Sequence, residues 1–222
     1  MSELIVKNLR HTYTDGGTET EVLKGIDAKF ESGKMYAIVG ESGSGKSTLI
    51  SLLSGLDKIQ SGEVLLNGES AKEIGEQKYR LGHVNIVFQA FNLIKYMTAR
   101  ENVEVAIDFL NDSQGDIKER AYKLLEAVGI DRQKADRLVN NLSGGEQQRA
   151  AIARCMVGDV PVIIADEPTG NLDEKTEEKI LQIFHQLAED GKIVIIVTHS
   201  KKVAEHAHAE VWRMKGGVLT KK

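Results

Sequence analysis

The sequence of 222 residues predicts an α/β fold with a mostly parallel sheet, an antiparallel β portion at the N-terminus and an inserted helical subdomain. Three observations lead to this fold class. Short runs rich in β-branched residues are apolar throughout, as strands are when both faces of a parallel sheet are covered. Helical patterns lie between these runs. The stretch from about residue 98 to residue 157 shows helical patterns and no convincing strand.

The β-type runs and the turns between them can be placed along the chain. One helix is expected to follow the first glycine-rich loop at Thr48, and another covers residues 180–187, where apolar side chains recur at helical spacing. Asn67-Gly68 and Gly216-Gly217 lie beside β-type runs and predict tight hairpins. The expected strands are residues 35–39, 63–66, 84–88, 162–165 and 193–198.

The predicted helical subdomain covers residues 90–158. It interrupts an α/β core made of residues 1–89 and 159–222, and the whole chain forms one domain. Thr98-Ala-Arg-Glu101 has the form of a capping box and predicts a helix start. Gly129 is placed to end a later helix. The apolar stripe of that helix is Ile117, Ala121, Leu124, Leu125 and Val128.

Composition restricts the class of protein. With 41% hydrophobic and 28% charged residues and a net charge of −4, the chain resembles an ordinary globular protein, and no nucleic-acid partner is expected. Its single cysteine, Cys155, cannot form an intramolecular disulfide, which fits a reducing compartment. The N-terminus shows no apolar signal segment, and the longest apolar runs are too short to span a bilayer. We therefore expect a cytoplasmic protein that reaches a membrane only through a partner.

The clearest motif is Gly40-Glu-Ser-Gly-Ser-Gly-Lys-Ser47, which fits G-x-x-x-x-G-K-[ST] between a predicted strand and a predicted helix. Its backbone N–H groups can surround phosphates, and Lys46 adds a positive charge at their β/γ end. Ser47 can hold Mg²⁺. We call residues 40–47 the phosphate loop. The predicted nucleotide contacts of this region are Gly40, Glu41, Ser42, Gly43, Ser44, Gly45, Lys46, Ser47 and Thr48. The alternative is a glycine-rich turn without a ligand.

Two acids, Asp166 and Glu167, follow the buried run at residues 162–165. Ligands of open parallel sheets bind at the carboxyl ends of the strands. Asp166 would help to hold Mg²⁺, and Glu167 could take a proton from an attacking water. The alternative is that both are solvated charges that cap the next element.

Three other residues are candidates by position. His199 ends the run at residues 193–198 and could bond a γ-phosphate or orient water, and Gln89 follows another run, where its amide oxygen could reach Mg²⁺ or the water. On position alone, the more common role for both is that of ordinary polar residues at strand ends. Tyr13 lies near a glycine-rich turn and could stack on a base. Adenine is favoured, since the sequence has no N-K-x-D guanine motif. The alternative for Tyr13 is a half-exposed strand tyrosine.

A second helix start with exposed backbone lies at Ser143-Gly144-Gly145-Glu146, which we call the Ser143 turn. A capping box explains the serine and the glutamate. It does not explain two glycines, each of which weakens a helix by up to about 1 kcal/mol relative to alanine. Missing side chains would let an anion approach the backbone amides closely.

Taken in order, these motifs resemble those of an ABC-type ATPase, the nucleotide-binding subunit of an ABC transporter, over nearly the whole chain. The phosphate loop resembles the Walker A loop of a P-loop NTPase core, and the Ser143 turn with Leu142 resembles the ABC signature. Asp166 and Glu167 resemble the end of Walker B and its catalytic glutamate. The other matches are Tyr13 to the A-loop, Gln89 to the Q-loop, Asn171-Leu-Asp173 to the D-loop and His199 to the switch histidine.

This resemblance implies how the two helix starts are used. Two copies would pair head to tail around two ATP with Mg²⁺, each ATP lying between one phosphate loop and the other copy's Ser143 turn, with Asp173 nearby. Lys46, Gln89, Glu167 and His199 would carry the chemistry. Ser47, Gln89 and Asp166 would hold the metal.

The segments 87–93, 142–154 and 165–173 are similar to the branch that includes lipoprotein-release, macrolide or antimicrobial-peptide efflux, and cell-division ABC ATPases. That branch implies an integral membrane permease as partner, a place at the inner face of the cell membrane, and export or mechanical work. A periplasmic or extracellular accessory protein would fit too. The candidate permease groove is Phe91, Leu93, Ile94, Tyr96 and Met97, with the core of the helical subdomain as its alternative.

Two other functions are possible on the sequence alone. A soluble ABC ATPase of DNA maintenance or translation would carry long coiled-coil insertions or twin cassettes, and neither occurs here. A non-catalytic nucleotide-binding regulator would not need the intact Asp166, Glu167 and His199. A transporter ATPase therefore remains the favoured prediction.

Overall fold

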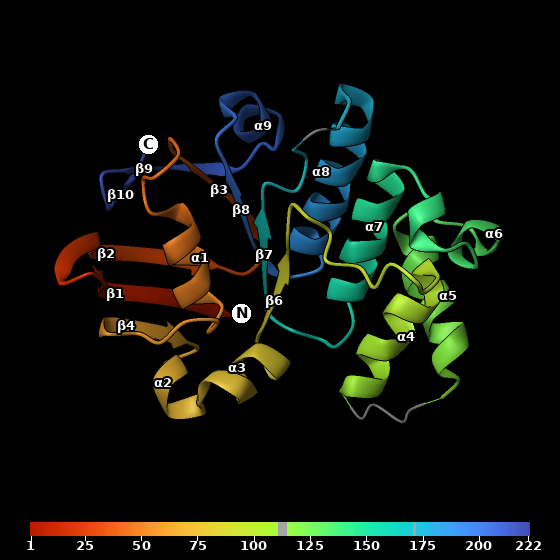
Figure 1. Ribbon diagram of the computed structural model, residues 1–222, viewed down its shortest axis with the longest axis horizontal. Coiled ribbons are helices and arrows are strands. Elements are labelled where there is room, and N and C mark those ends of the chain that lie inside the picture. Colours follow the sequence, from red (N-terminus) through yellow and green to blue (C-terminus); the bar gives the residue numbers. More distant parts are fainter. Residues whose placement is uncertain (111–114, 171) are drawn as a thin grey trace.

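The computed structural model describes residues 1–110, 115–170 and 172–222. Within this part of the chain, the strands form two sheets, one of six strands in the order β10-β9-β3-β8-β7-β6 and one of four in the order β2-β1-β4-β5. Figure 1 shows β1, β2 and β4 of the four-stranded sheet at one end of the molecule and helices α4 to α7 at the other, with β6, β7 and β8 of the larger sheet between them. The strands are β1 (Glu3–Asp15), β2 (Thr18–Glu31), β3 (Lys34–Val39), β4 (Ser61–Leu66), β5 (Glu69–Ser70), β6 (Val84–Val87), β7 (Val162–Asp166), β8 (Ile193–Thr198), β9 (Glu210–Lys215) and β10 (Val218–Lys221).

The larger sheet is parallel except at one edge. β3 pairs in parallel with β8 and β9, and β7 pairs in parallel with β6 and β8, whereas β10 is antiparallel to β9. Every residue of β8 is buried, as the unbroken apolar run predicted. All five strands expected from the sequence are present, with ends within two residues of the predicted ones. The mostly parallel sheet is thus confirmed.

The antiparallel parts are hairpins built on tight turns. β1 and β2 pair along most of their length. Asn67 and Gly68, with φ of 52° and 86°, join β4 to β5, and Gly216 and Gly217, with φ of 54° and 86°, join β9 to β10. Positive φ at both central positions is the geometry of a two-residue hairpin turn, which asparagine and glycine tolerate. Both predicted hairpins are confirmed.

Two predicted helix boundaries lie where local signals place them. The Thr98 capping box is formed at the start of α4, and Gly129 takes a φ of 77° two residues after the end of α5. The helix expected from Thr48 starts at Lys46 instead. The helices are α1 (Lys46–Leu53), α2 (Ala71–Ile74), α3 (Glu76–Gly82), α4 (Ala99–Phe109), α5 (Ile117–Ala127), α6 (Arg132–Ala135), the 3₁₀ turn η1 (Val139–Asn141), α7 (Gly144–Cys155), α8 (Glu174–Glu189) and α9 (Lys201–His206). None of them is long and apolar enough to cross a bilayer, among the residues described.

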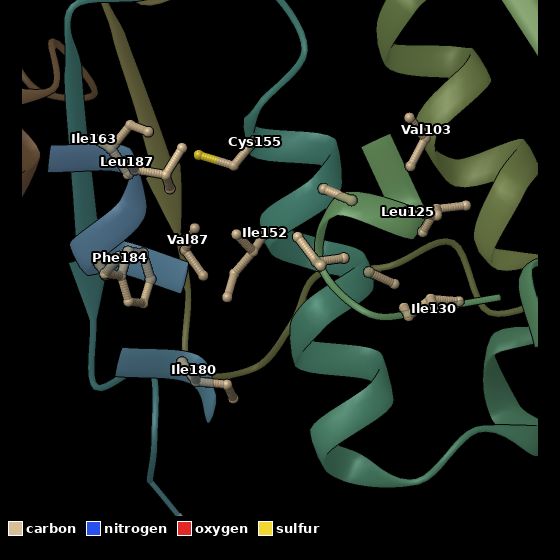
Figure 2. Packing of buried hydrophobic residues seen from close by; sticks show 14 of the residues in the cluster. Val87, Val103, Leu125, Ile130, Ile152, Cys155, Ile163, Ile180, Phe184 and Leu187 are labelled. Carbon is tan, nitrogen blue, oxygen red and sulfur yellow. The ribbon is translucent and has the colours of Figure 1, made fainter. Parts of the chain in front are cut away.

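Two hydrophobic clusters hold the fold together. One fills the space between the two sheets around α1. The other joins the opposite face of the larger sheet to α8 and then to α7, α5 and α4. Figure 2 shows Val87 and Ile163 of the sheet, Phe184 and Leu187 of α8, and Ile152 of α7 gathered in this second cluster. The division into a core and an inserted subdomain at residues 90 and 158 stays an interpretation, since one continuous cluster extends across both borders.

Candidate nucleotide-binding site

The phosphate loop connects β3 to α1 and needs glycine at two of its positions. A Cβ on Gly40 would lie 2.4 Å from the carbonyl oxygen of Met214, and a Cβ on Gly45 would lie 2.8 Å from Met214 Cε. Gly45, with a φ of 103°, is the N-cap of α1 and supplies no side-chain cap. The first turn of α1 also has no acidic residue. Its backbone N–H groups are therefore available to an anion.

Two polar side chains of the loop fit an anionic ligand. Lys46 Nζ donates to the carbonyl oxygens of Gly40 (2.8 Å) and Glu41 (2.9 Å), which bends the lysine back over the loop. The Ser44 hydroxyl is buried, with the residue 7% exposed, and it has no partner within the described part of the chain. A buried unpaired hydroxyl costs free energy, so a bound phosphate oxygen would remove that cost.

A pocket of about 430 Å³ brings most of the predicted site residues together. Four segments that lie far apart in the sequence contribute to it, and the carboxyl ends of β6, β7 and β8 lead into it, as expected for an open parallel sheet. Val22 of β2 also lines it, which the sequence did not predict. We call it the nucleotide pocket, and its lining is Val22, Ser42, Gly43, Gly45, Lys46, Ser47, Thr48, Gln89, Asp166, Glu167 and His199.

The two acids at the end of β7 differ in their surroundings. Burial is the main cause that raises the pKa of Asp166, and the neighbouring Glu167 charge raises it further, against a smaller opposite effect of Lys46. Glu167 has a φ of 46°, and its backbone N–H donates to the carbonyl oxygen of Val197 at 2.8 Å. A bulky residue in the left-handed region is uncommon and costs about 1–3 kcal/mol. This backbone conformation lowers the stability of the fold, and with it the Glu167 side chain lines the nucleotide pocket.

The Glu167 carboxylate is held at both oxygens. Thr198 Oγ1 donates to Oε2 at 2.9 Å, while the His199 backbone N–H donates to Oε1 at 2.8 Å. His199 Nδ1 lies 2.7 Å from the same Oε1. Thr198 was missed from the sequence, where it reads as one more β-branched residue of a buried strand. Its signal is the hydroxyl placed directly before His199.

Gln89 and Tyr13 lie beside this site in different ways. Gln89 follows β6 and extends over the turn after Glu167, because a Cβ on Gly170 would lie 2.9 Å from its Nε2. Tyr13 is 44% exposed and does not line the nucleotide pocket, but its hydroxyl lies 3.4 Å from Thr48 Oγ1. Its ring and that of His11 form a T-shaped pair, with centroids 4.6 Å apart. Base stacking by Tyr13 stays a prediction.

A Mg²⁺ site at Ser47, Gln89 and Asp166 also stays a prediction. All three residues line the nucleotide pocket. A hydroxyl, an amide oxygen and one carboxylate are oxygen donors of the kind that Mg²⁺ combines with phosphate oxygens. No group of three or more histidine, cysteine or acidic residues able to hold a metal occurs in residues 1–110, 115–170 and 172–222. Phosphate oxygens would have to complete the coordination.

The Ser143 turn is a complete capping box. Ser143 Oγ accepts from the Glu146 backbone N–H at 3.4 Å, and Glu146 Oε2 accepts from the Ser143 N–H at 2.9 Å. The bond from the Ser143 N–H is the largest cause that lowers the pKa of Glu146 to about 2, with help from Lys134. The capping alternative is therefore confirmed. The turn does not line the nucleotide pocket of its own chain.

The two glycines of the turn have different surroundings. A Cβ on Gly145 would lie 2.4 Å from Thr176 Cγ2, closer than real Cβ contacts. A Cβ on Gly144 would make only ordinary contacts, 3.6 Å to Leu172 Cδ2 and 4.0 Å to Phe91 Cζ. The sequence suggests that both missing side chains make room for an anion. The contact with Thr176 explains instead why residue 145 is a glycine. Among the described residues, no such close contact explains the glycine at position 144.

Asp173, expected near a nucleotide, caps α8. Its Oδ1 accepts from the Thr176 N–H at 3.1 Å, and its Oδ2 accepts from Thr176 Oγ1 at 2.7 Å. These bonds from Thr176 lower the pKa of Asp173. Asn171, the first residue of the predicted D-loop, lies outside the described residues. Both carboxylate oxygens of Asp173 therefore already accept hydrogen bonds within its own chain.

Comparison with known proteins decides the family. The model of the family described as "ABC transporter" matches residues 23–170, more than half of the chain. The chain belongs to the ABC transporter family. It is 41% identical to the uncharacterized ABC transporter ATP-binding protein YclH of Bacillus subtilis, over 88% of this chain and 87% of YclH. It is 41% identical to the macrolide export ATP-binding/permease protein MacB of Bdellovibrio bacteriovorus, over 96% of this chain but only 33% of MacB. These relatives agree with the branch expected from the sequence.

A solved structure with the same fold supports the assignment. A dimeric structure of the ATP-binding cassette MJ0796, in a post-hydrolysis state bound to ADP and Pi, matches with a TM-score of 0.86 and 36% identity over 98% of both chains. The chain is thus an ATP-binding and ATP-hydrolysing subunit of the ABC type.

Proposed function

We propose that two copies of this chain enclose two ATP molecules, each between the phosphate loop of one copy and the Ser143 turn of the other. Hydrolysis then drives a membrane permease that is a separate chain. The observation that carries this proposal is that the Ser143 turn does not line the nucleotide pocket of its own chain, although no close contact requires its glycine at position 144. A two-fold dimer would use both starts in each of two equal sites. The dimeric MJ0796 structures support this arrangement.

The phosphate loop would hold the triphosphate of ATP. The uncapped N–H groups of α1 and the buried Ser44 hydroxyl would donate to phosphate oxygens. Lys46 Nζ has three donors and uses two on Gly40 and Glu41, so it can add a phosphate oxygen or exchange a carbonyl for one. Tyr13, next to Thr48, would stack on the adenine ring.

Ser47, Gln89 and Asp166 would hold Mg²⁺ against the phosphates. A bound Mg²⁺ would neutralise charge on the β- and γ-phosphates during transfer. Asp166 is half-buried next to another acid, which disfavours its charged form. A cation at this position would reverse that effect.

Glu167 would act as the base. A water oxygen attacks the γ-phosphorus, its proton moves to a Glu167 oxygen, and the bond from phosphorus to the bridging oxygen breaks to give ADP and phosphate. Thr198 and His199 hold the carboxylate in place. Lys46 and the partner subunit's Ser143 and Gly145 would stabilise the charge of the transferred group.

A second pocket, of about 250 Å³, offers a docking place for the permease. It lies among α3, β6, α4 and α7, and Phe109 at its rim is 68% exposed. The residues of the groove predicted from the sequence do not all lie in this pocket. Ile94 lines it, whereas Leu93 packs on the core and Tyr96 is 79% exposed. We propose that an apolar cytoplasmic segment of the permease binds this surface. The chain would thereby lie at the inner face of the membrane, and an extracellular or periplasmic accessory protein would act through the permease.

Complementation tests the shared site. A Lys46→Ala copy and a Ser143→Ala copy should each be nearly inactive alone. Mixed in equal amounts, random pairing gives half mixed dimers, each with one intact composite site, so about one quarter of wild-type ATPase activity should return. No recovery, while both variants fold and associate, would contradict the proposal.

A further inference from the structure

The Ser143 turn packs against the first turn of α8, and the capping box does not account for this contact. Thr176 Cγ2 occupies the space where residue 145 would carry a side chain, since a Cβ there would lie 2.4 Å away. Leu172 lies beside Gly144 in the same way, at an ordinary distance. Both glycines therefore rest on residues 172–176, the segment that follows Glu167 and leads into α8.

Thr176 is fixed in the orientation that makes this contact. Its hydroxyl donates to Asp173 Oδ2 at 2.7 Å, and its backbone N–H donates to Asp173 Oδ1 at 3.1 Å. A β-branched side chain has few allowed χ1 rotamers in a helix. Rotating the methyl group away from Gly145 would break the bond from the hydroxyl to Asp173.

We infer that Thr176 is a positioning residue whose methyl group sets the distance between the Ser143 turn and residues 172–176, the segment that follows Glu167. The position of α7 would thereby follow that of the chain's own hydrolysis site. The contact itself depends only on packing within one chain. Its effect on catalysis rests on the proposed function, because the Ser143 turn acts on the partner subunit's ATP.

The inference separates two quantities that a general folding defect would change together. Neither Thr176 nor Gly145 lines the nucleotide pocket. ATP affinity of the isolated chain should therefore be unchanged when this contact is altered, while kcat falls. A misplacement of about 1 Å can cost up to about 10²-fold in rate.

Four variants test the contact: Gly145→Ala, Thr176→Ser, the double variant, and Gly144→Ala as the matched control for adding a methyl group to this helix start. Gly145→Ala should lower Tm by about 3–9 °C, as an overpacked site does, and lower kcat at least about tenfold. Gly144→Ala should leave Tm unchanged or raise it, because alanine is the better helix former. Thr176→Ser keeps the hydroxyl and should lower kcat only about two- to fivefold.

The double variant decides the question, because serine lacks the methyl group that meets the new Cβ. The double variant should regain more than half of the Tm that Gly145→Ala loses. Its kcat should be at least about tenfold higher than that of Gly145→Ala. If Gly145→Ala does not fold, recovery of folded, active protein in the double variant gives the same support.

Recovered Tm with kcat still low would overturn the positioning role, since Gly145 would then be needed by the nucleotide itself. No recovery of either quantity would overturn the contact. If the wild-type protein has no ATPase activity, the proposed function fails, while the Tm values still test the contact.

Discussion

Replacing Glu167 by glutamine removes the proposed base and leaves its surroundings nearly intact. The glutamine oxygen can take the place of Oε1 and accept from the His199 backbone N–H, which lies 2.8 Å from Oε1 in the wild type. The amide NH₂ can take the place of Oε2 and donate to Thr198 Oγ1, which has lone pairs available although it already accepts from the Ser200 N–H. The bond from the His199 N–H is therefore kept, whereas the bond with Thr198 reverses its direction and the Thr198 hydroxyl hydrogen loses its acceptor. The main change is the loss of basicity.

The expected loss of rate follows from that chemistry. A positioned base contributes about 10²–10⁴-fold, so turnover should fall by at least about 10²-fold, which corresponds to about 2.7 kcal/mol in the barrier. Stability should change little, with Tm within about 4 °C of the wild type. ATP binding should be kept, and the dimer with uncleaved ATP should accumulate.

Phosphate release at saturating ATP measures the rate, and gel filtration with ATP measures the dimer. Thr198→Val is the companion variant, because it keeps the shape of the side chain and removes one of the donors to the carboxylate. Its rate should lie between those of the wild type and Glu167→Gln. Turnover of Glu167→Gln within about threefold of the wild type would refute the assignment of the base.

Substitutions at three other positions have defined outcomes. Ser143→Ala removes the cap of α7 and should lower Tm by about 2–4 °C, while its ATPase activity falls far more than that loss explains; retained activity with the lower Tm would assign Ser143 to the fold alone. Glu146 has a pKa of about 2 in the folded chain and 4.5 as its ordinary value, so its charge stabilises the fold fully above pH 4.5 and this stabilisation is lost as the pH falls toward 2. Glu146→Gln keeps a capping-box residue without the charge, so its Tm should depend less on pH over that range in thermal unfolding experiments. Tyr13→Ala should raise the KM for ATP several-fold with kcat little changed, whereas Tyr13→Phe keeps the ring and should bind ATP nearly as the wild type does; equal KM values for all three would exclude stacking.

The sequence was sufficient for most of the fold because its strongest signals are local. The all-apolar run of β8 and the glycine hairpins reflect backbone and burial requirements that a few neighbouring residues decide. The shared hydrophobic cluster was not predictable in the same way. Val87 of β6 and Phe184 of α8 lie far apart in sequence and join one cluster because α8 packs on a face of the larger sheet.

The candidate site, too, was predictable where its signals are local and not where they depend on contacts between distant segments. The phosphate loop is one continuous motif, and the acids at the end of β7 were placed by the rule that ligands bind at the carboxyl ends of parallel strands. The role of Thr198 depends on a hydrogen bond to Glu167 across two strands, and the need for glycine at position 145 depends on Thr176. Neither partner can be inferred from residue type or spacing.

The two halves of the proposed shared site differ in how many of their polar groups already have hydrogen-bond partners. The phosphate-loop half leaves the α1 start uncapped and the Ser44 hydroxyl unpaired among the described residues. The Ser143 half has its serine bonded to Glu146 and Gly145 packed on Thr176. A ligand therefore gains more by entering the phosphate loop, where it satisfies polar groups that otherwise lack partners. This difference favours one order of binding, in which ATP binds to one chain first and that chain then binds to its partner.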